Sequence, residues 1–209
     1  ATALAVQVSA ELLGRPGSDP ASVSRALPAR LLPRWRSGVS AHPDAHPFTP
    51  TEHERAGCNL DEAALPAYGA TLVVALIAPD GVYLVQIGDG DALVYMAGGV
   101  LRPVRDDPRL VGNQTTSLCL PDALSDFRHG FVAAAHQPSL VLVSTDGYGN
   151  SFAADDWAPA VLTDVARLVD RDGWAAVEAA LPEWVAESAR VGGDDVTVLI
   201  GMPPGPAAG

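Results

Sequence analysis

At its centre the chain reads Val82-Tyr-Leu-Val-Gln-Ile-Gly-Asp-Gly-Asp91, a run of branched apolar residues that ends on aspartates set beside glycines. The pattern recurs in Leu140-Val-Leu-Val-Ser-Thr-Asp-Gly147 and, in reverse order, in Gly192-Gly-Asp-Asp-Val-Thr-Val-Leu-Ile200. Apolar runs of this length and composition predict strands, so each aspartate is expected at a strand end. Glycine beside each aspartate allows a sharp turn and the close approach of a ligand. The three runs therefore predict a β-rich core with carboxylates at the edge of a sheet.

Carboxylates gathered at one sheet edge repel each other unless they share a proton or a cation. A hard divalent ion such as Mg²⁺ or Mn²⁺ binds through oxygen ligands and is the natural counter-charge, which indicates metal-assisted chemistry. An aspartate–glycine pair after a strand is also a common turn, and Asp80-Gly81 fits that interpretation. From the pattern alone, a metal site and simple turns both remain open for the other aspartates.

The composition excludes several classes of protein. The 209 residues suit one domain, and 48% hydrophobic residues are too many for a disordered chain. A net charge of −12 argues against nucleic acid and anionic membranes as partners, because both need a basic face. The longest apolar run, Thr71 to Ala78, is far shorter than the ~20 residues that span a bilayer. Since Ala1 to Leu13 also lacks the basic start of a secretory signal, we expect a cytoplasmic protein.

The basic residues and the cysteines narrow the possible chemistry further. All 13 basic residues are arginine, which excludes Walker-type loops, Schiff bases and lysine general bases. Two cysteines, Cys58 and Cys119, are too few for a disulfide framework and lack the spacing of metal ligands. The aspartates at the strand ends are left as the main candidates for chemistry.

Hydrophobic periodicity divides the chain into helices at both ends and strands between them. The predicted helices cover Ala1–Leu13, Ser22–Trp35 (broken by Pro28 and Pro33), Ala154–Asp170 and Trp174–Arg190. The predicted strands cover Ala70–Ala78, Val82–Ile87 and Ala92–Met96 as a meander, then Phe131–Ala135, Leu140–Ser144 and Val196–Gly201. Gly38–Pro66 is predicted as an irregular connection that contains about one helical turn. This order predicts an α+β domain in which helices cover antiparallel sheet.

Four motifs follow one another along the chain: Tyr68-Gly-Ala-Thr-Leu-Val-Val-Ala-Leu76, Ile87-Gly-Asp-Gly-Asp-Ala-Leu93, Ser144-Thr-Asp-Gly-Tyr148 and Gly193-Asp-Asp-Val-Thr197. In this order and spacing they resemble the metal-dependent serine/threonine protein phosphatases of type 2C. Two further segments, Thr115-Thr-Ser-Leu-Cys119 and Tyr148-Gly-Asn-Ser-Phe152, resemble the divergent bacterial branch of that family, often seen in actinobacteria. The resemblance covers about residues 1–201, which we take as one phosphatase-like domain, followed by a disordered tail at residues 202–209.

The resemblance implies a four-layer α-β-β-α sandwich of two antiparallel sheets flanked by helices, with two Mn²⁺ or Mg²⁺ ions at one edge. It also implies that Asp146 and Asp194 are metal-ligating carboxylates and that Asp89 is the ligand of a weaker third ion. The implied reaction is hydrolysis of phosphoserine and phosphothreonine in proteins by a metal-activated water, without a covalent intermediate. The implied partners are phosphoprotein substrates, including those of a cognate serine/threonine kinase.

The sequence departs from the family pattern at several places. Ala1 lies inside the first predicted helix without an N-cap residue, so we expect an upstream segment. That segment would carry the missing N-terminal strands, the Asp-Gly motif that bridges both ions and the phosphate-binding arginine. Gly90-Asp91 replaces the usual Ser-Arg, Asp195 replaces an asparagine, and Asn150 stands where many members carry an acid.

These departures leave alternatives to an active phosphatase. A catalytically impaired pseudophosphatase would use the same sandwich as a binding or regulatory module. A structural α+β protein would use its aspartates only as turn residues. Three arginines also have two interpretations: Arg102, Arg105 and Arg109 either bind phosphate or pair with Asp106 and Asp107 at the surface, and we expect the pairing.

Overall fold

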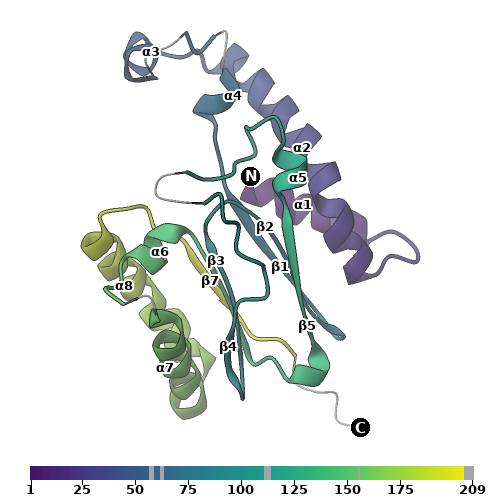
Figure 1. Ribbon diagram of the computed structural model, residues 1–209, viewed down its shortest axis with the longest axis vertical. Helices are drawn as coiled ribbons and strands as arrows, with labels where there is room; N and C mark the ends of the chain where they lie inside the picture. Colours follow the sequence, from purple (N-terminus) through teal and green to yellow (C-terminus); the bar gives the residue numbers. More distant parts are fainter. Residues whose placement is uncertain (57–58, 62–63, 111–113, 155, 205–209) are drawn as a thin grey trace.

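Two antiparallel sheets lie face to face at the centre of the molecule (Figure 1). The computed structural model describes residues 1–56, 59–61, 64–110, 114–154 and 156–204. The first sheet has the order β1-β2-β5, with β1 at Leu72–Ala78, β2 at Gly81–Ile87 and β5 at Arg128–Ala133. The second has the order β4-β3-β6-β7, with β3 at Asp91–Met96, β4 at Gly99–Leu101, β6 at Leu140–Ser144 and β7 at Val198–Gly201.

Helices cover the outer face of each sheet (Figure 1). The first sheet is covered by α1 (Thr2–Leu13) and α2 (Pro20–Ala45), and the second by α7 (Trp157–Asp172) and α8 (Trp174–Gly192). Shorter helices are α3 (Pro50–Ala56), α4 (Ala64–Ala67), α5 (Ala123–Asp126) and α6 (Asp146–Asn150). The predicted α+β sandwich, with two antiparallel sheets flanked by helices, is therefore confirmed. No helix in the described part of the chain is both long and apolar enough to cross a membrane.

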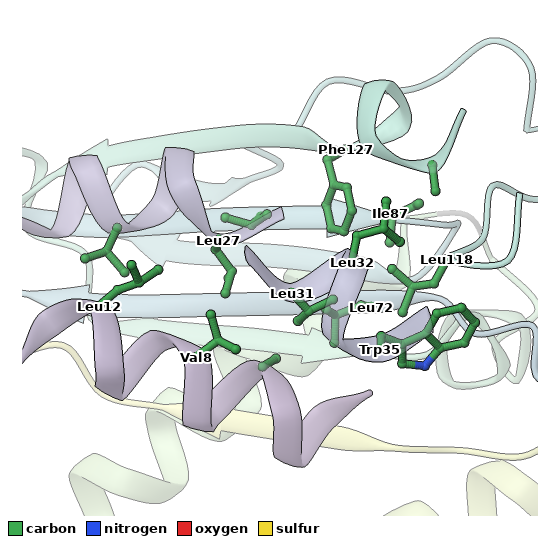
Figure 2. Close-up of a cluster of buried hydrophobic side chains, with 14 of the residues drawn as sticks. Val8, Leu12, Leu27, Leu31, Leu32, Trp35, Leu72, Ile87, Leu118 and Phe127 are labelled. Atoms are coloured by element: carbon green, nitrogen blue, oxygen red, sulfur yellow. The ribbon is translucent and has the colours of Figure 1, made fainter. Parts of the chain in front are cut away.

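Strand β2 is buried along its whole length because both of its faces are covered. On one face, Val82 and Leu84 pack between the two sheets against residues such as Val141 of β6. On the other face, Ile87 packs under α2, where Leu27 and Leu31 point towards the sheet (Figure 2). An apolar side chain buried in this way stabilises the fold by about 1.5–3 kcal/mol. The uninterrupted apolar run from Val82 therefore follows from the position of β2 between two layers.

Helix α2 corrects the prediction that Pro28 and Pro33 break the second helix. The helix is continuous for 26 residues, with Pro20 in its first turn and Asp19 as its N-cap, whose side chain accepts the Ser22 N–H. An interior proline costs about 3 kcal/mol. The helix is retained because one face buries a long apolar stripe against the first sheet, and Figure 2 shows much of it. The buried apolar residues of this stripe are Val23, Leu27, Leu31, Leu32, Trp35 and Val39.

Two further predictions need correction. Gly38–Pro66 was predicted as an irregular connection with about one helical turn, whereas α2 continues to Ala45 and is followed by two short helices, α3 and α4. The predicted meander was also wrong at its third strand, because β3 pairs with β4 and β6 of the second sheet instead of with β2. The chain crosses between the sheets within Gly88–Gly90, where Gly88 has φ +98°, a conformation that favours glycine. Predictions about Cys58 and residues 205–209 fall outside the described residues.

Candidate active site

Three segments that end or begin strands meet at one end of the sandwich. Asp89 lies in the crossing from β2 to β3, and Asp146 follows β6 at the start of α6. Asp91 pairs with Ser144 in the β3–β6 register, so the crossing lies beside the end of β6. Asp194 lies in the segment between α8 and β7, the strand that pairs with β6. The topology therefore brings the predicted strand-end carboxylates to the same end of the fold.

Hydrogen bonds of the backbone and of one side chain join the Asp146 segment to the Asp194 segment. The Thr145 N–H donates to the Thr197 carbonyl at 3.0 Å, and the Thr197 N–H donates to the Thr145 hydroxyl at 3.0 Å. Gly147 is packed against the same segment: a Cβ atom there would lie 2.6 Å from the Asp195 carbonyl oxygen and 3.3 Å from Asp194 Cβ. Since only glycine allows this approach, Gly147 brings the backbone beside Asp146 against Asp194.

The turn that carries Asp89 is held by side chains from other strands and loops. The Gly88 N–H donates to the Thr116 hydroxyl at 2.9 Å. The buried Gln86 amide donates to the carbonyls of Gly88 and Gly90, and the Arg128 guanidinium also donates to the Gly88 carbonyl. The carbonyl oxygens on both sides of Asp89 are thus fixed by protein donors.

The Asp146 carboxylate has a perturbed pKa. Burial raises its pKa above the usual range for an aspartate, and the nearby carboxylates of Asp89 and then Asp194 raise it further. The Gly147 N–H, which donates to Asp146 at 3.0 Å, opposes part of this shift. None of the three carboxylates forms an ion pair with a basic side chain in the part of the chain that the structure describes. Their mutual repulsion is the electrostatic condition that a bound cation would relieve.

The described residues contain no group of three or more His, Cys, Asp or Glu side chains arranged to hold a metal ion. Asp89 and Asp146 are half-buried, whereas Asp194 is exposed and accepts the N–H of Asp195 at 2.7 Å. Protein sites for Mg²⁺ commonly use one or two carboxylates and fill the other positions with water. The donor set, made only of oxygen atoms, therefore suits a hard cation that keeps part of its hydration shell.

Two of the three arginines considered in the sequence, Arg102 and Arg109, form ion pairs with acidic side chains. Arg102 pairs with Asp91. Arg109 pairs with Asp107 at 2.6 Å and with the buried Asp126 at 2.9 Å. The predicted pairing of these arginines with neighbouring acids is thus confirmed for Asp107, and it holds the pKa of Asp107 down at about 2. Asp91 and Asp126 were not foreseen as partners, because both are distant from their arginines in sequence.

A cavity of about 260 Å³ opens beside the Asp89 turn. Its lining includes side chains of both charges: Asp89, Asp91, Asp106, Arg102 and Arg128 are among them. Gln86, Thr116 and Arg128 also belong to this region, and none of them was among the predicted site residues. Gln86 did carry a signal, since it is the one polar side chain inside the otherwise apolar and aromatic run Val82–Ile87. Arg128 carried none, because its place depends on the pairing of β5 with β2.

The sequence model of the family described as Protein phosphatase 2C matches residues 1–186. The chain belongs to this phosphatase 2C family. The match includes the Asp89 turn and Asp146 but ends before Asp194, whose place beside Asp146 rests on the packing at Gly147. A search of curated proteins returned no match.

Solved structures share the phosphatase 2C fold at low sequence identity. The catalytic domain of the serine/threonine phosphatase PstP, in complex with two manganese ions, has a TM-score of 0.58 at 16% identity, with 97% of this chain and 80% of that chain covered. A C. elegans sex-determining protein has a TM-score of 0.60 at 15% identity, with 97% and 52% covered. PppA of Pseudomonas aeruginosa, a regulatory component of its T6SS, has a TM-score of 0.57 at 19% identity, with 95% of this chain and 77% of that chain covered.

Proposed function

We propose that this protein is a metal-dependent phosphatase that hydrolyses phosphoserine and phosphothreonine in proteins. The observation that carries the proposal is the meeting of Asp146, Asp89 and Asp194 at one end of the sandwich, where burial, and then repulsion from the other two carboxylates, raises the pKa of Asp146. Membership of the phosphatase 2C family supports the reaction class, and the two manganese ions of PstP support a dependence on Mn²⁺ or Mg²⁺.

The proposed roles follow the geometry. Asp146 and Asp194 would hold the ions of the main site, because Gly147 brings their segments into contact. Asp89, whose charge also acts on Asp146, would hold a more weakly bound third ion. When bound, such ions supply an activated water for attack on phosphorus and neutralise the phosphoryl oxygens. The cavity beside Asp89 would give the phosphorylated residue access to this end of the fold.

The remaining proposals concern the bounds of the catalytic unit, its substrates and its location in the cell. We place the catalytic unit at residues 1–201, because β7 ends at Gly201. The substrates would be phosphoproteins, including those of a cognate serine/threonine kinase, and the setting would be the cytoplasm. The acidic surface, with a net charge of −12, gives no support to nucleic acid or an anionic membrane as a partner.

Hydrolysis of a phosphothreonine peptide with and without Mn²⁺ tests the function. Wild-type turnover should require the metal, and Asp146→Asn should reduce kcat/KM by at least about 100-fold, because it removes a carboxylate ligand of the ions that activate water. Asp164→Asn is the matched control, since Asp164 is an exposed residue of α7 with only a 3.4 Å contact to Arg167. Metal-independent turnover, or full activity in Asp146→Asn, would refute the proposal.

A pseudophosphatase is the second candidate, and two observations favour it. The described residues offer no closed set of three ligands, and Asp91 is neutralised by Arg102. This alternative predicts that calorimetric titration with Mn²⁺ shows weak binding and that the protein binds phosphopeptides without hydrolysing them. Tight binding of Mn²⁺ at two sites would count against it.

A further inference from the structure

The turn Gly88–Asp91 is held by hydrogen bonds from two side chains, Gln86 and Arg128, to its backbone carbonyls. Gln86 of β2 and Arg128 of β5 are direct partners in the β2–β5 register, so their side chains lie next to each other on one face of the first sheet. Both side chains donate to the turn from there. Neither residue is among the candidate metal ligands.

Gln86 is a polar side chain at a position that otherwise favours an apolar one. It is only 4% exposed, and the other residues of β2 are buried with it. A buried amide without partners costs about 1–3 kcal/mol, so its presence requires hydrogen bonds that compensate. Its Nε2 group finds them in the carbonyls of Gly88, at 3.2 Å, and Gly90. These carbonyls belong to the residues before and after Asp89, so Gln86 holds the turn on both sides of that residue.

Arg128 holds the same turn from the neighbouring strand. One terminal nitrogen donates to the Gly88 carbonyl, and the other donates to the Arg105 carbonyl at 2.9 Å. Its Nε–H is buried without a partner, so the guanidinium is placed for the turn at the cost of one unmade hydrogen bond. A charged donor makes a stronger hydrogen bond to a carbonyl than a neutral one.

We infer that Gln86 and Arg128 are positioning residues that hold the Asp89 carboxylate in place for cation binding. This inference rests on the proposed function, since it takes Asp89 as a ligand. An unsupported turn that contains Gly88 and Gly90 would be mobile, because glycine has the largest backbone freedom. Fixing the carbonyls beside Asp89 lowers the entropy lost when its carboxylate binds an ion. Partners outside the first coordination shell commonly contribute about 10–100-fold to metal affinity.

Side-chain replacements that keep shape test the inference. Gln86→Met and Arg128→Met remove the donors and keep most of the apolar stem. Arg36→Met is the matched control, because Arg36 also donates to a backbone carbonyl, that of Leu120, and also has a buried Nε–H without a partner. Calorimetry with Mn²⁺ should show about 10–100-fold weaker binding at the Asp89 site in the two test variants and less than about twofold change in Arg36→Met.

A double-mutant cycle and a metal-free measurement complete the test. In the Asp89→Asn background, Arg128→Met should change Mn²⁺ affinity no further, because the carboxylate that it positions is gone. In the presence of EDTA, amide exchange at Gly88, which donates to Thr116, should be at least about tenfold faster in the test variants than in Arg36→Met.

The outcomes separate this inference from the proposed function. If wild type binds no Mn²⁺, or if Asp89→Asn binds it as wild type does, the ligand role of Asp89 fails and the inference fails with it. If Asp89→Asn weakens binding but Gln86→Met and Arg128→Met do not, only the positioning role is overturned. Faster amide exchange at Gly88 with unchanged Mn²⁺ affinity would also overturn the positioning role, because the hydrogen bonds would then stabilise the turn without affecting cation binding.

Discussion

Replacing Gly147 by alanine should separate the two carboxylate segments with the smallest possible chemical change. The added Cβ would lie 2.6 Å from the carbonyl oxygen of Asp195. Carbon–oxygen contacts are normally about 3.3–3.6 Å, so the Asp195 segment must move by at least about 0.7 Å. The obstructing atom belongs to the backbone, and it cannot be cleared by rotating a side chain.

That displacement has a cost in stability and a cost in binding. Overpacking of this kind typically lowers the free energy of unfolding by about 1–3 kcal/mol. Constellations of functional groups tolerate only about 0.5 Å of error, which the required movement exceeds. We therefore expect Mn²⁺ affinity to fall by at least about tenfold and phosphopeptide turnover to fall with it.

The assay compares three proteins by Mn²⁺ calorimetry, urea unfolding and metal-dependent turnover. Gly38→Ala is the control, because a Cβ at Gly38, inside α2, meets nothing within 4 Å. It should raise stability by about 0.5–1 kcal/mol, since alanine is the better helix residue, and leave Mn²⁺ binding unchanged. Should Gly147→Ala keep wild-type affinity for Mn²⁺, Asp146 and Asp194 do not act as one site and the reasoning is refuted.

Three further predictions concern the scaffold. Leu162→Ala should lower the free energy of unfolding in urea by about 2–5 kcal/mol, because Leu162 is fully buried, whereas Leu124→Ala at a 52% exposed position should cost less than about 1 kcal/mol. Arg109 lowers the pKa of Asp107 to about 2, so its stabilisation is present above about pH 4 and lost as the pH falls towards 2. The Tm difference between wild type and Asp107→Asn should accordingly be largest at neutral pH and shrink as the pH falls from about 4 through about 2. The hydrogen bond to Asp80 raises the pKa of Tyr83 to about 12, and an absorbance titration of Asp80→Asn should find it lower.

Patterns of short range predicted most of the scaffold. Strand β6 has the predicted bounds Leu140–Ser144, and α1 and α8 differ from their predictions by one or two residues. Their signals are local, because apolar periodicity and a flanking Gly or Pro define each element without reference to the rest of the chain. The strand-end positions of Asp89 and Asp146 followed from the same signals.

Features that depend on tertiary packing were not predictable in this way. The continuity of α2 through Pro28 and Pro33 results from burial against the first sheet, which outweighs the local preference of proline. The assignment of β3 to the second sheet depends on its pairing with β6, although its sequence continues directly from β2. The place of Arg128 near the site was not predictable either, because it depends on the β2–β5 register, which sets Arg128 beside Gln86.

The geometry of the site implies that the fold tolerates repulsion to keep its carboxylates together. Asp146 carries a raised pKa because burial and two nearby acids disfavour its charge. A protein selected only for stability would replace one of these acids, since like charges without a partner destabilise the folded state. The segments are instead drawn together by the Thr145–Thr197 hydrogen bonds and by the close packing at Gly147. These contacts hold the acidic side chains close together although their charges repel. This is expected of a site that a cation completes and not of simple turns.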